Sequence, residues 1–440
     1  CRSGIQGGTF MLHNTFCRRL AALVLTLAVA VSAVLPVFAV YPMPIQTATE
    51  TEAVYLFNAD TGKTLLTQNA DQPRYVASLT KMMTALLLLE SGKDLNGEVT
   101  VPTDLTQEFK DIQNANGTTM GLRIGETVRR IDLLNALLIT SANDAASVIA
   151  WDVGGSLNAF IQQMNARAAE LGCTSATFTC AHGLYDYGNV ASAEDMAKIA
   201  AACAANETFA QVAGSTTYTL GQTNFHSEQR TISSSNPLMD ASGAYYKDSV
   251  KWVKGGFTTL AGRCAVALDQ KDGHTYGLVI LGSDSNEHLY SECDELFDWA
   301  FASFADRPLV DTQTVVTTVD LTKCRTHPEV ELYAAAPVSG YGHADDKVSY
   351  SFDLPESVSA TVKNGQKLGT ATVYLDGCEV GQVDLVTHQE YVSDFRTDSR
   401  STLLLLAALA VILLVLSVVT LACGGGSLNL NRRRRMKRRR

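Results

Sequence analysis

A serine and a lysine three residues apart open one of the most apolar helical runs of the chain. Ser78 and Lys81 stand in "YVASLTKMMTALLLLE", residues 75–90, so in a helix they share one face about one turn apart. A serine hydroxyl becomes a good nucleophile when a base takes its proton. A desolvated lysine near another cation loses proton affinity and can act as that base. The pair alone is equally compatible with a helix N-cap followed by a solvated lysine, so its chemistry depends on further residues.

Two later stretches supply those residues. Ser141 and Asn143 stand in "TSANDAA", and Lys254 is followed by two glycines in "VKGGFTTLAGRC". The order matches the Ser-x-x-Lys, Ser-x-Asn and Lys-[Thr/Ser]-Gly motifs of serine acyl-transfer enzymes that recognise penicillin. With "ASLTKMMTALLLLE", "HGL" and "GFTTLAGRC", residues 53–304 closely resemble the D-alanyl-D-alanine carboxypeptidases, the low-molecular-weight penicillin-binding proteins.

The resemblance implies a catalytic role for three side chains. Ser78 would attack the carbonyl of a peptide bond while Lys81 takes its proton. Ser141 would relay that proton to the leaving amine, because a hydroxyl both accepts and donates. Water would then hydrolyse the acyl-serine.

The resemblance also implies a set of substrate-binding residues. Asn143 would hold the substrate backbone with its amide, although capping a helix is the structural alternative. Lys254 would be a fixed cation that attracts the terminal carboxylate of the substrate and lowers the proton affinity of Lys81. The backbone N–H groups of Ser78 and of Phe257, which follows Gly256, would form the oxyanion hole.

One position departs from the family pattern. Gly255 stands where the family usually has threonine or serine, whose hydroxyl helps to bind the substrate carboxylate. Thr258, or less readily Thr259, is a candidate to compensate. His182 in "AHGLYDYGN" matches a family loop beside the site, and we interpret it as structural or substrate-flanking rather than as a proton-transfer group.

The resemblance therefore predicts a serine-type D-Ala-D-Ala carboxypeptidase. Its substrate would be a peptidoglycan stem peptide ending in D-Ala-D-Ala, and β-lactam antibiotics would bind it covalently. A β-lactamase is a second hypothesis, but no Glu-x-x-Leu-Asn motif lies between Ser141 and Lys254. A catalytically weak penicillin-binding or wall-sensing protein is a third, which Gly255 favours and the retained serines and lysines oppose.

The two ends of the chain indicate export and anchoring. Residues 11–39 have the layout of a signal peptide, with arginines before an apolar stretch and a small residue at Ala39. Residues 402–423 carry no charge, and at ~1.5 Å per residue they span about 33 Å, enough for a membrane core. The tail, residues 424–440, holds eight basic side chains in its last nine residues and should stay in the cytoplasm. We therefore expect a single-pass protein of the cell membrane with an extracellular catalytic domain.

Charge and cysteine content exclude other classes of function. The net charge is −10, and without the basic side chains of residues 432–440 it is −18, which argues against a nucleic-acid partner. The exported part has seven cysteines, an odd number, and pairing of Cys173 with Cys180 or of Cys324 with Cys378 stays open. The sequence has no HExxH or paired CxxC motif, so we expect neither a metal nor a cofactor.

The element pattern predicts an α+β catalytic domain at residues 48–306. Strands at 53–68 and 249–283 enclose helical runs at 78–90, 129–155, 157–171 and 193–206, and a helix follows at 293–304. Strands at both ends with helices between them predict an antiparallel sheet packed by helices, as in the β-lactamase and transpeptidase fold. Short alternating strands with Asn-Gly and Asp-Gly turns predict a small all-β domain at 309–392.

Overall fold

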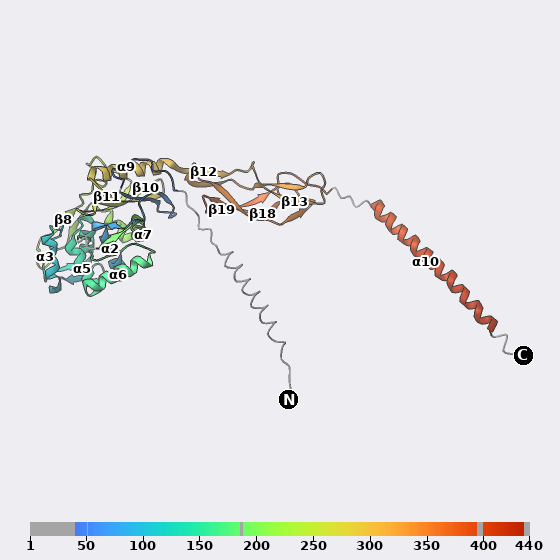
Figure 1. The fold of residues 1–440 in the computed structure, drawn as a ribbon, viewed down its shortest axis with the longest axis horizontal. Helices are drawn as coiled ribbons and strands as arrows, with labels where there is room; N and C mark the ends of the chain where they lie inside the picture. Colours follow the sequence, from blue (N-terminus) through green and yellow to red (C-terminus); the bar gives the residue numbers. More distant parts are fainter. Residues whose placement is uncertain (1–39, 51, 185–187, 394–398, 435–440) are drawn as a thin grey trace, which may run out of the picture. The chain divides into compact units, whose positions relative to one another are not determined.

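The computed structural model describes residues 40–50, 52–184, 188–393 and 399–434. The expected signal peptide at 11–39 and the last six residues of the tail lie outside these ranges. The chain divides into two compact units (Figure 1). The first runs to Ala305 and also holds Tyr341–Asp346, whereas the second holds Asp306–Gly340 and the residues from Lys347 on.

A five-stranded antiparallel sheet forms the centre of the first unit. Its strand order is β2-β1-β11-β10-β9, so the first strands of the chain pair with the last strands of the unit. The sheet consists of β1 (Ala53–Asn58), β2 (Thr64–Gln68), β9 (Val250–Thr258), β10 (Gly262–Lys271) and β11 (His274–Ser283). Because β9 lies at the edge of this sheet, one side of the strand remains available to the site described below.

Helices cover both faces of the sheet. The face opposite α9 carries α2 (Thr80–Glu90), α4 (Arg130–Ile139), α5 (Asn143–Gly154), α6 (Leu157–Glu170), α7 (Ala193–Ala204) and α8 (Glu207–Ala213). The other face packs on α9 (Asn286–Ser303), and each face has its own apolar core. Eight of the eleven residues of α2 are buried, which explains why its sequence is apolar all round. The antiparallel sheet packed by helices confirms the predicted fold class.

Short elements connect this framework. They are the 3-10 turns η1 (Ala77–Leu79) and η2 (Thr103–Leu105), the helix α3 (Thr106–Asn114), and the paired strands β3 (Arg74–Tyr75) with β6 (Val190–Ala191), β4 (Glu98–Thr100) with β5 (Thr127–Arg129), and β7 (Thr217–Leu220) with β8 (Arg230–Ser233).

Three helix boundaries differ from the prediction. The helix expected from Ser78 begins at Thr80, because η1 precedes it. The helical run expected over 129–155 is two helices, since Ser141 adopts a φ of 60° and a left-handed residue ends a right-handed helix. The helix expected from 293 begins at Asn286, where the Ser285 side chain accepts a hydrogen bond from the backbone of His288.

The second unit contains a mixed six-stranded sheet in the order β16-β18-β19-β14-β13-β17. Its strands are β13 (Val315–Thr322), β14 (Glu329–Ala334), β16 (Val348–Asp353), β17 (Ser357–Ser359), β18 (Lys367–Leu375) and β19 (Cys378–Val386), and β12 (Phe304–Val310) pairs separately with β15 (Val338–His343). β18 and β19 form the hairpin expected around Asp376-Gly377. The all-β character of this region agrees with the predicted fold class.

The segment Tyr341–Asp346 belongs to the first unit, although it lies outside the expected 48–306 range. Its Asp346 carboxylate accepts hydrogen bonds from the Tyr41 hydroxyl and, at 2.9 Å, from the Lys63 ammonium. The exposed fractions of the Lys63 and Asp346 side chains are 11% and 1%. This buried ion pair fastens the segment to the sheet.

The last helix, α10 (Ser399–Arg434), contains one stretch that is long and apolar enough to cross a membrane. It covers Leu403–Leu421, 19 residues with a mean hydropathy of 3.1. Among the described residues it is the one helix of that kind, and it coincides with the apolar run expected at 402–423.

Candidate active site

The turn η1 and the first turn of α2 bring Ser78 and Lys81 together. Ser78 lies half-buried on η1, and Lys81 follows one turn later with no exposed surface. The ammonium nitrogen of Lys81 lies 2.9 Å from the hydroxyl oxygen of Ser78. Lys81 is therefore buried against the serine hydroxyl, so the pair is not a capped helix followed by a solvated lysine.

Two further oxygens hold the ammonium group of Lys81 in place. Its Nζ donates to Oδ1 of Asn143 at 2.8 Å and to the backbone carbonyl of His182 at 2.7 Å. Burial, and then the charge of Lys254, lowers the pKa of Lys81 well below its ordinary value. A lysine that loses its proton easily and touches a serine hydroxyl is suited to general-base catalysis.

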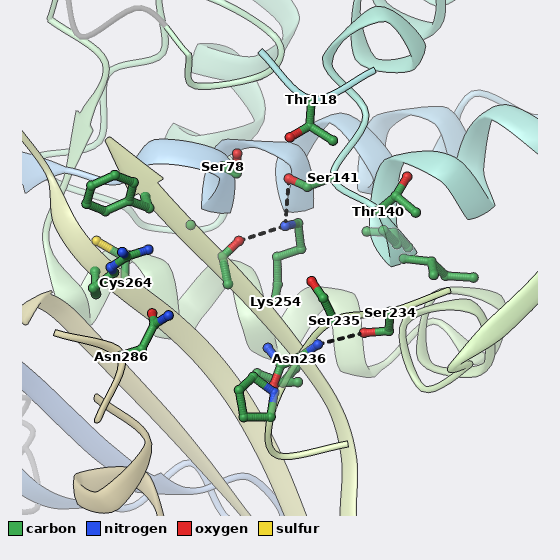
Figure 2. Close-up of a pocket in the computed structure, with 18 of the residues that line it drawn as sticks. Ser78, Thr118, Thr140, Ser141, Ser234, Ser235, Asn236, Lys254, Cys264 and Asn286 are labelled. Atoms are coloured by element: carbon green, nitrogen blue, oxygen red, sulfur yellow. Dashed lines mark hydrogen bonds between the residues drawn. The ribbon is translucent and has the colours of Figure 1, made fainter. Parts of the chain in front are cut away.

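Ser141 and Lys254 form the second polar pair of the site (Figure 2). Ser141 stands at the break between α4 and α5, and the Nζ of Lys254 donates to its hydroxyl at 3.1 Å and to the Gly255 carbonyl at 2.7 Å. Burial lowers the pKa of Lys254 to about 7. Burial therefore weakens the hold of Lys254 on its proton.

Asn143 is held at both ends of its side chain. Its Nδ2 donates to the Thr118 carbonyl at 2.9 Å, and its Oδ1 accepts from Lys81. Its backbone N–H donates to the same Thr118 carbonyl at 2.8 Å. Asn143 thus fixes Lys81 and the loop at Thr118, in addition to lining the cavity where a substrate backbone would pass.

His182 lies beneath the site rather than in it. The side chain is buried, and its Nε2 lies 2.9 Å from Oε1 of Glu108, while its Nδ1 accepts from the Leu184 backbone at 2.9 Å. The same Glu108 oxygen accepts from the Ser147 hydroxyl at 3.1 Å. This geometry agrees with the structural interpretation of His182, whose carbonyl rather than its ring meets Lys81.

Glu108 is a residue that the sequence did not suggest. Burial acts to raise its pKa, but the hydrogen bond and charge of His182 outweigh burial, so the pKa is lowered. Nothing in the spacing of α3 distinguishes this glutamate from Asp111, the other carboxylate of the same helix. Its role is visible only after the fold brings it to His182.

Gly256 allows β9 to approach η1 closely. A Cβ built on Gly256 would lie 2.9 Å from the backbone nitrogen of Ser78 and 3.3 Å from that of Leu79. Any side chain would therefore push the strand away from the start of α2. The close approach brings Gly256, the residue before Phe257, next to the backbone nitrogen of Ser78.

Phe257 and Thr258 follow at the end of β9. The Phe257 ring is 51% exposed, and the guanidinium carbon of Arg263 lies 3.8 Å from its centroid. The Thr258 hydroxyl accepts from the Ala261 backbone at 3.0 Å in the turn to β10. Thr258 does not line the cavity, so the structure does not bring it together with the other expected residues.

These residues surround an open cavity of about 500 Å³. The expected residues Ser78, Ser141, Asn143, Lys254, Gly256 and Phe257 line it, and Lys81 lies directly behind Ser78. The lining also includes groups that the sequence did not suggest, among them Thr118, Asn236, Arg263, Asn286 and Tyr290. Cys173 and Cys180 are free thiols, so they do not form the bridge left open above.

Comparison with known proteins agrees with this geometry. Residues 42–285 match the family described as D-alanyl-D-alanine carboxypeptidase, and residues 304–393 match the C-terminal domain of penicillin-binding protein 5. The chain is 27% identical to the D-alanyl-D-alanine carboxypeptidase DacF of Bacillus subtilis over 333 residues, which cover 75% of this chain and 83% of that protein. It is 28% identical to DacC of Escherichia coli over 348 residues, covering 77% and 83%.

Solved structures show the same fold. Penicillin-binding protein 5 of Haemophilus influenzae superposes with a TM-score of 0.57 at 24% identity, over 80% of this chain and all of that one. The D-alanyl-D-alanine carboxypeptidase of Mycobacterium tuberculosis superposes with a TM-score of 0.52 at 26% identity, over 60% and 94%. The chain belongs to the D-alanyl-D-alanine carboxypeptidase family, serine hydrolases that act on peptidoglycan peptides ending in D-Ala-D-Ala and bind penicillins.

Proposed function

We propose that Ser78 is the nucleophile of this carboxypeptidase and that Lys81 is its general base. The observation that carries the proposal is the 2.9 Å contact between a fully buried lysine and the serine hydroxyl. Neutral Lys81 takes the hydroxyl proton as Ser78 attacks the carbonyl carbon of the penultimate D-alanine. The developing oxyanion is stabilised by the backbone N–H groups of Ser78 and Phe257.

Collapse of the tetrahedral intermediate releases the terminal D-alanine. Ser141 donates its proton to the leaving amine and recovers a proton from the Lys254 ammonium, while Lys81 keeps the proton that it took from Ser78 and returns it to Ser78 when the acyl group leaves. Water then attacks the acyl-Ser78 ester and frees the shortened stem peptide. Penicillin enters the same path, because its β-lactam carbonyl is attacked by Ser78 and its ring-opened product remains attached.

Mass spectrometry after penicillin treatment tests this assignment. The adduct should lie on the peptide that contains Ser78, and Ser78→Ala should carry none. Released D-alanine from a D-Ala-D-Ala peptide, measured in parallel, should disappear in the same variant. An adduct that persists in Ser78→Ala would contradict the assignment of Ser78 as the nucleophile.

We further propose that α10 anchors the protein in the cell membrane with the catalytic domain outside. The apolar Leu403–Leu421 stretch and the arginines that follow support this orientation, since positive flanks stay in the cytoplasm. Protease added to intact cells should release the domains that precede α10 and leave the basic tail, residues 424–440, intact. Loss of the tail under those conditions would show that the proposed orientation is wrong.

We propose that residues 48–306 form the catalytic domain and that the β domain at 309–392 acts as a spacer. Because Tyr341–Asp346 belongs to the first unit, a truncation at residue 304 also removes the Asp346 partner of Lys63. The informative variant is therefore a full-length chain with a protease site placed after Asp376, in the exposed β18–β19 turn. Unchanged peptide turnover after cleavage would support a spacer, and lost turnover in a folded product would contradict it.

A further inference from the structure

The active-site cavity continues past the edge strand at Gly255. Besides the residues around Ser78, its lining includes Asn236 from the segment before β9, Arg263 from β10, and Asn286 and Tyr290 from α9. In Figure 2, Asn286 is seen across the Lys254 strand from Ser78 and Ser141. Gly255 has no side chain to close this passage, so the cavity extends to a lobe, defined here as the part lined by those four residues.

The lobe is built around the place of the missing side chain. A Cβ at Gly255 would lie 3.6 Å from Nδ2 of Asn236 and 3.8 Å from the Tyr290 hydroxyl, which is ordinary contact distance. The Oδ1 of Asn236 accepts from the Leu238 backbone at 3.1 Å, which turns its Nδ2 toward Gly255. Hydrogen-bonding groups therefore converge where the family places a hydroxyl.

Arg263 provides the positive charge of the lobe. It lies opposite Phe257 in the β9–β10 register, half-buried, with its guanidinium stacked on the Phe257 ring. Its charge reaches Tyr290, where it opposes the burial that raises the pKa of that phenol to about 12. Among the residues that the structure describes, no carboxylate forms an ion pair with Arg263, so its N–H donors remain available to a ligand.

The ammonium group of Lys254 is already engaged by other groups. Its Nζ donates to Ser141 and to the Gly255 carbonyl, and burial lowers its pKa to about 7. An arginine stays protonated at every physiological pH and offers a fork of donors that suits a carboxylate. Besides Lys254, Arg263 is the cationic side chain among the described residues that line the cavity.

We infer that Arg263, together with the amide of Asn236, binds the terminal carboxylate of the leaving D-alanine and replaces the hydroxyl absent at Gly255. This inference rests on the proposed function, because it takes Ser78 as the point of attack. Arg263 is then the residue by which the protein prefers a free carboxyl terminus. Its contact with the substrate is a charge-assisted hydrogen bond, and losing it should cost about 10- to 100-fold in kcat/KM.

A pair of peptides separates carboxylate binding from every other effect. One is an acetylated peptide ending in D-Ala-D-Ala as the free acid, and the other is its C-terminal amide. In Arg263→Gln the kcat/KM for the acid should fall about 10- to 100-fold and that for the amide by much less, so the preference for the acid should fall. Arg263→Lys should keep part of the preference, and Gly255→Thr should restore most of it in the Arg263→Gln background.

Arg123→Gln is the matched control, since Arg123 also stacks on a phenylalanine, Phe225, but does not line this cavity.

Binding measurements keep the test independent of turnover. In a Ser78→Ala background, the Kd of the acid peptide should rise by the same factor on Arg263→Gln, while the thermal midpoint of each variant reports folding. An unchanged acid preference, or equal losses for acid and amide, would overturn the inference. Failure of the wild-type protein to form a penicillin adduct on Ser78 would instead overturn the proposed function.

Discussion

The imidazole of His182 and the carboxylate of Glu108 meet at 2.9 Å directly behind the lysine that faces Ser78. The two side chains hold the loop whose His182 carbonyl accepts a hydrogen bond from Lys81. Lys81 is thus positioned through the backbone oxygen of His182, whose ring is paired with Glu108.

Glu108→Gln should weaken this support. The imidazole loses a charged partner, so we expect a loss of about 1–3 kcal/mol in unfolding free energy and acylation by penicillin slower by roughly tenfold. Burial opposes protonation of His182, whereas its bonds to Cys180 and Glu108 raise its pKa. The substitution should therefore lower that pKa, which NMR titration measures. Asp111→Asn, on the same helix but hydrogen-bonded to the exposed Gln107, should change neither quantity.

Lys81→Met should nearly abolish acylation while preserving the fold. Methionine fills similar volume without a charge, and the loss of general-base assistance costs typically 10²–10⁴-fold. Stopped-flow measurement with a fluorescent penicillin gives the acylation rate. A variant that acylates at the wild-type rate would remove Lys81 from its proposed role.

Lys254→Met should move the pH dependence of acylation. The charge of Lys254 is one cause of the lowered pKa of Lys81, so without it Lys81 binds its proton more tightly. Because acylation needs neutral Lys81, the midpoint of the rising rate should shift to higher pH, whatever happens to the maximal rate. A midpoint that stays in place would show that burial alone sets the pKa of Lys81.

Gly255→Thr should have an effect that depends on Arg263. A threonine Cβ fits at ordinary contact distances, so the variant should fold. In the wild-type background we expect a gain in kcat/KM of about two- to threefold, because Arg263 already binds the carboxylate. In Arg263→Gln the gain should reach about tenfold, a non-additivity expected of groups that share one partner.

Thr258→Val tests the compensation that the sequence suggested. The Thr258 hydroxyl accepts a hydrogen bond from the Ala261 backbone outside the cavity lining. We therefore expect unchanged kcat/KM and a loss of about 0.5–1.5 kcal/mol of stability. A fall in kcat/KM that is limited to free-acid peptides would show that Thr258 does contact the substrate carboxylate.

Glu52→Gln should flatten the pH dependence of stability. Burial and the neighbouring Glu292 raise the pKa of Glu52 to about 8. The folded state then binds a proton more tightly than the unfolded state, so its stabilising effect is complete below the unfolded pKa of about 4.5 and is lost as pH rises toward 8. The wild-type thermal midpoint should fall between pH 5 and 8, and Glu52→Gln should remove on the order of 5 °C of that fall. Glu50→Gln, on the exposed neighbour, should leave the fall unchanged.

The sequence predicted the parts of the fold that depend on local patterns. The strands around Asp272-Gly273 and the apolar run after Ser78 follow from turn chemistry and periodicity, and both exist as expected. The break at Ser141 was missed because its left-handed backbone is imposed by the packing of α4 and α5 and by the Lys254 contact, not by neighbouring residues. The assignment of Tyr341–Asp346 to the first unit was missed for the same reason, since its partner Lys63 lies far away in sequence.

The residues of the candidate site also fall into two groups, those that motifs predict and those that only the fold brings together. Ser78, Lys81, Ser141, Asn143 and Lys254 were found because their types and spacing form motifs, and the structure brings them together. Glu108 belongs to no motif, and Arg263 stands in the quoted "GFTTLAGRC" stretch but was not singled out there. Arg263 is placed at the cavity by its register opposite Phe257, and Glu108 lies on α3, a helix that was not predicted from the sequence. Residues that reach a site without a sequence motif can be identified only when the three-dimensional fold is known.

The open position at Gly255 has a consequence for antibiotic selectivity. A chain with threonine there fills the space beside Asn236 and Tyr290, whereas this protein leaves it empty. A β-lactam that carries a small extra group next to its carboxylate would fit into that space and would collide with threonine elsewhere. Such a compound would acylate this protein in preference to relatives that carry the threonine side chain. The glycine at position 255 would therefore allow a narrow-spectrum inhibitor to select this protein.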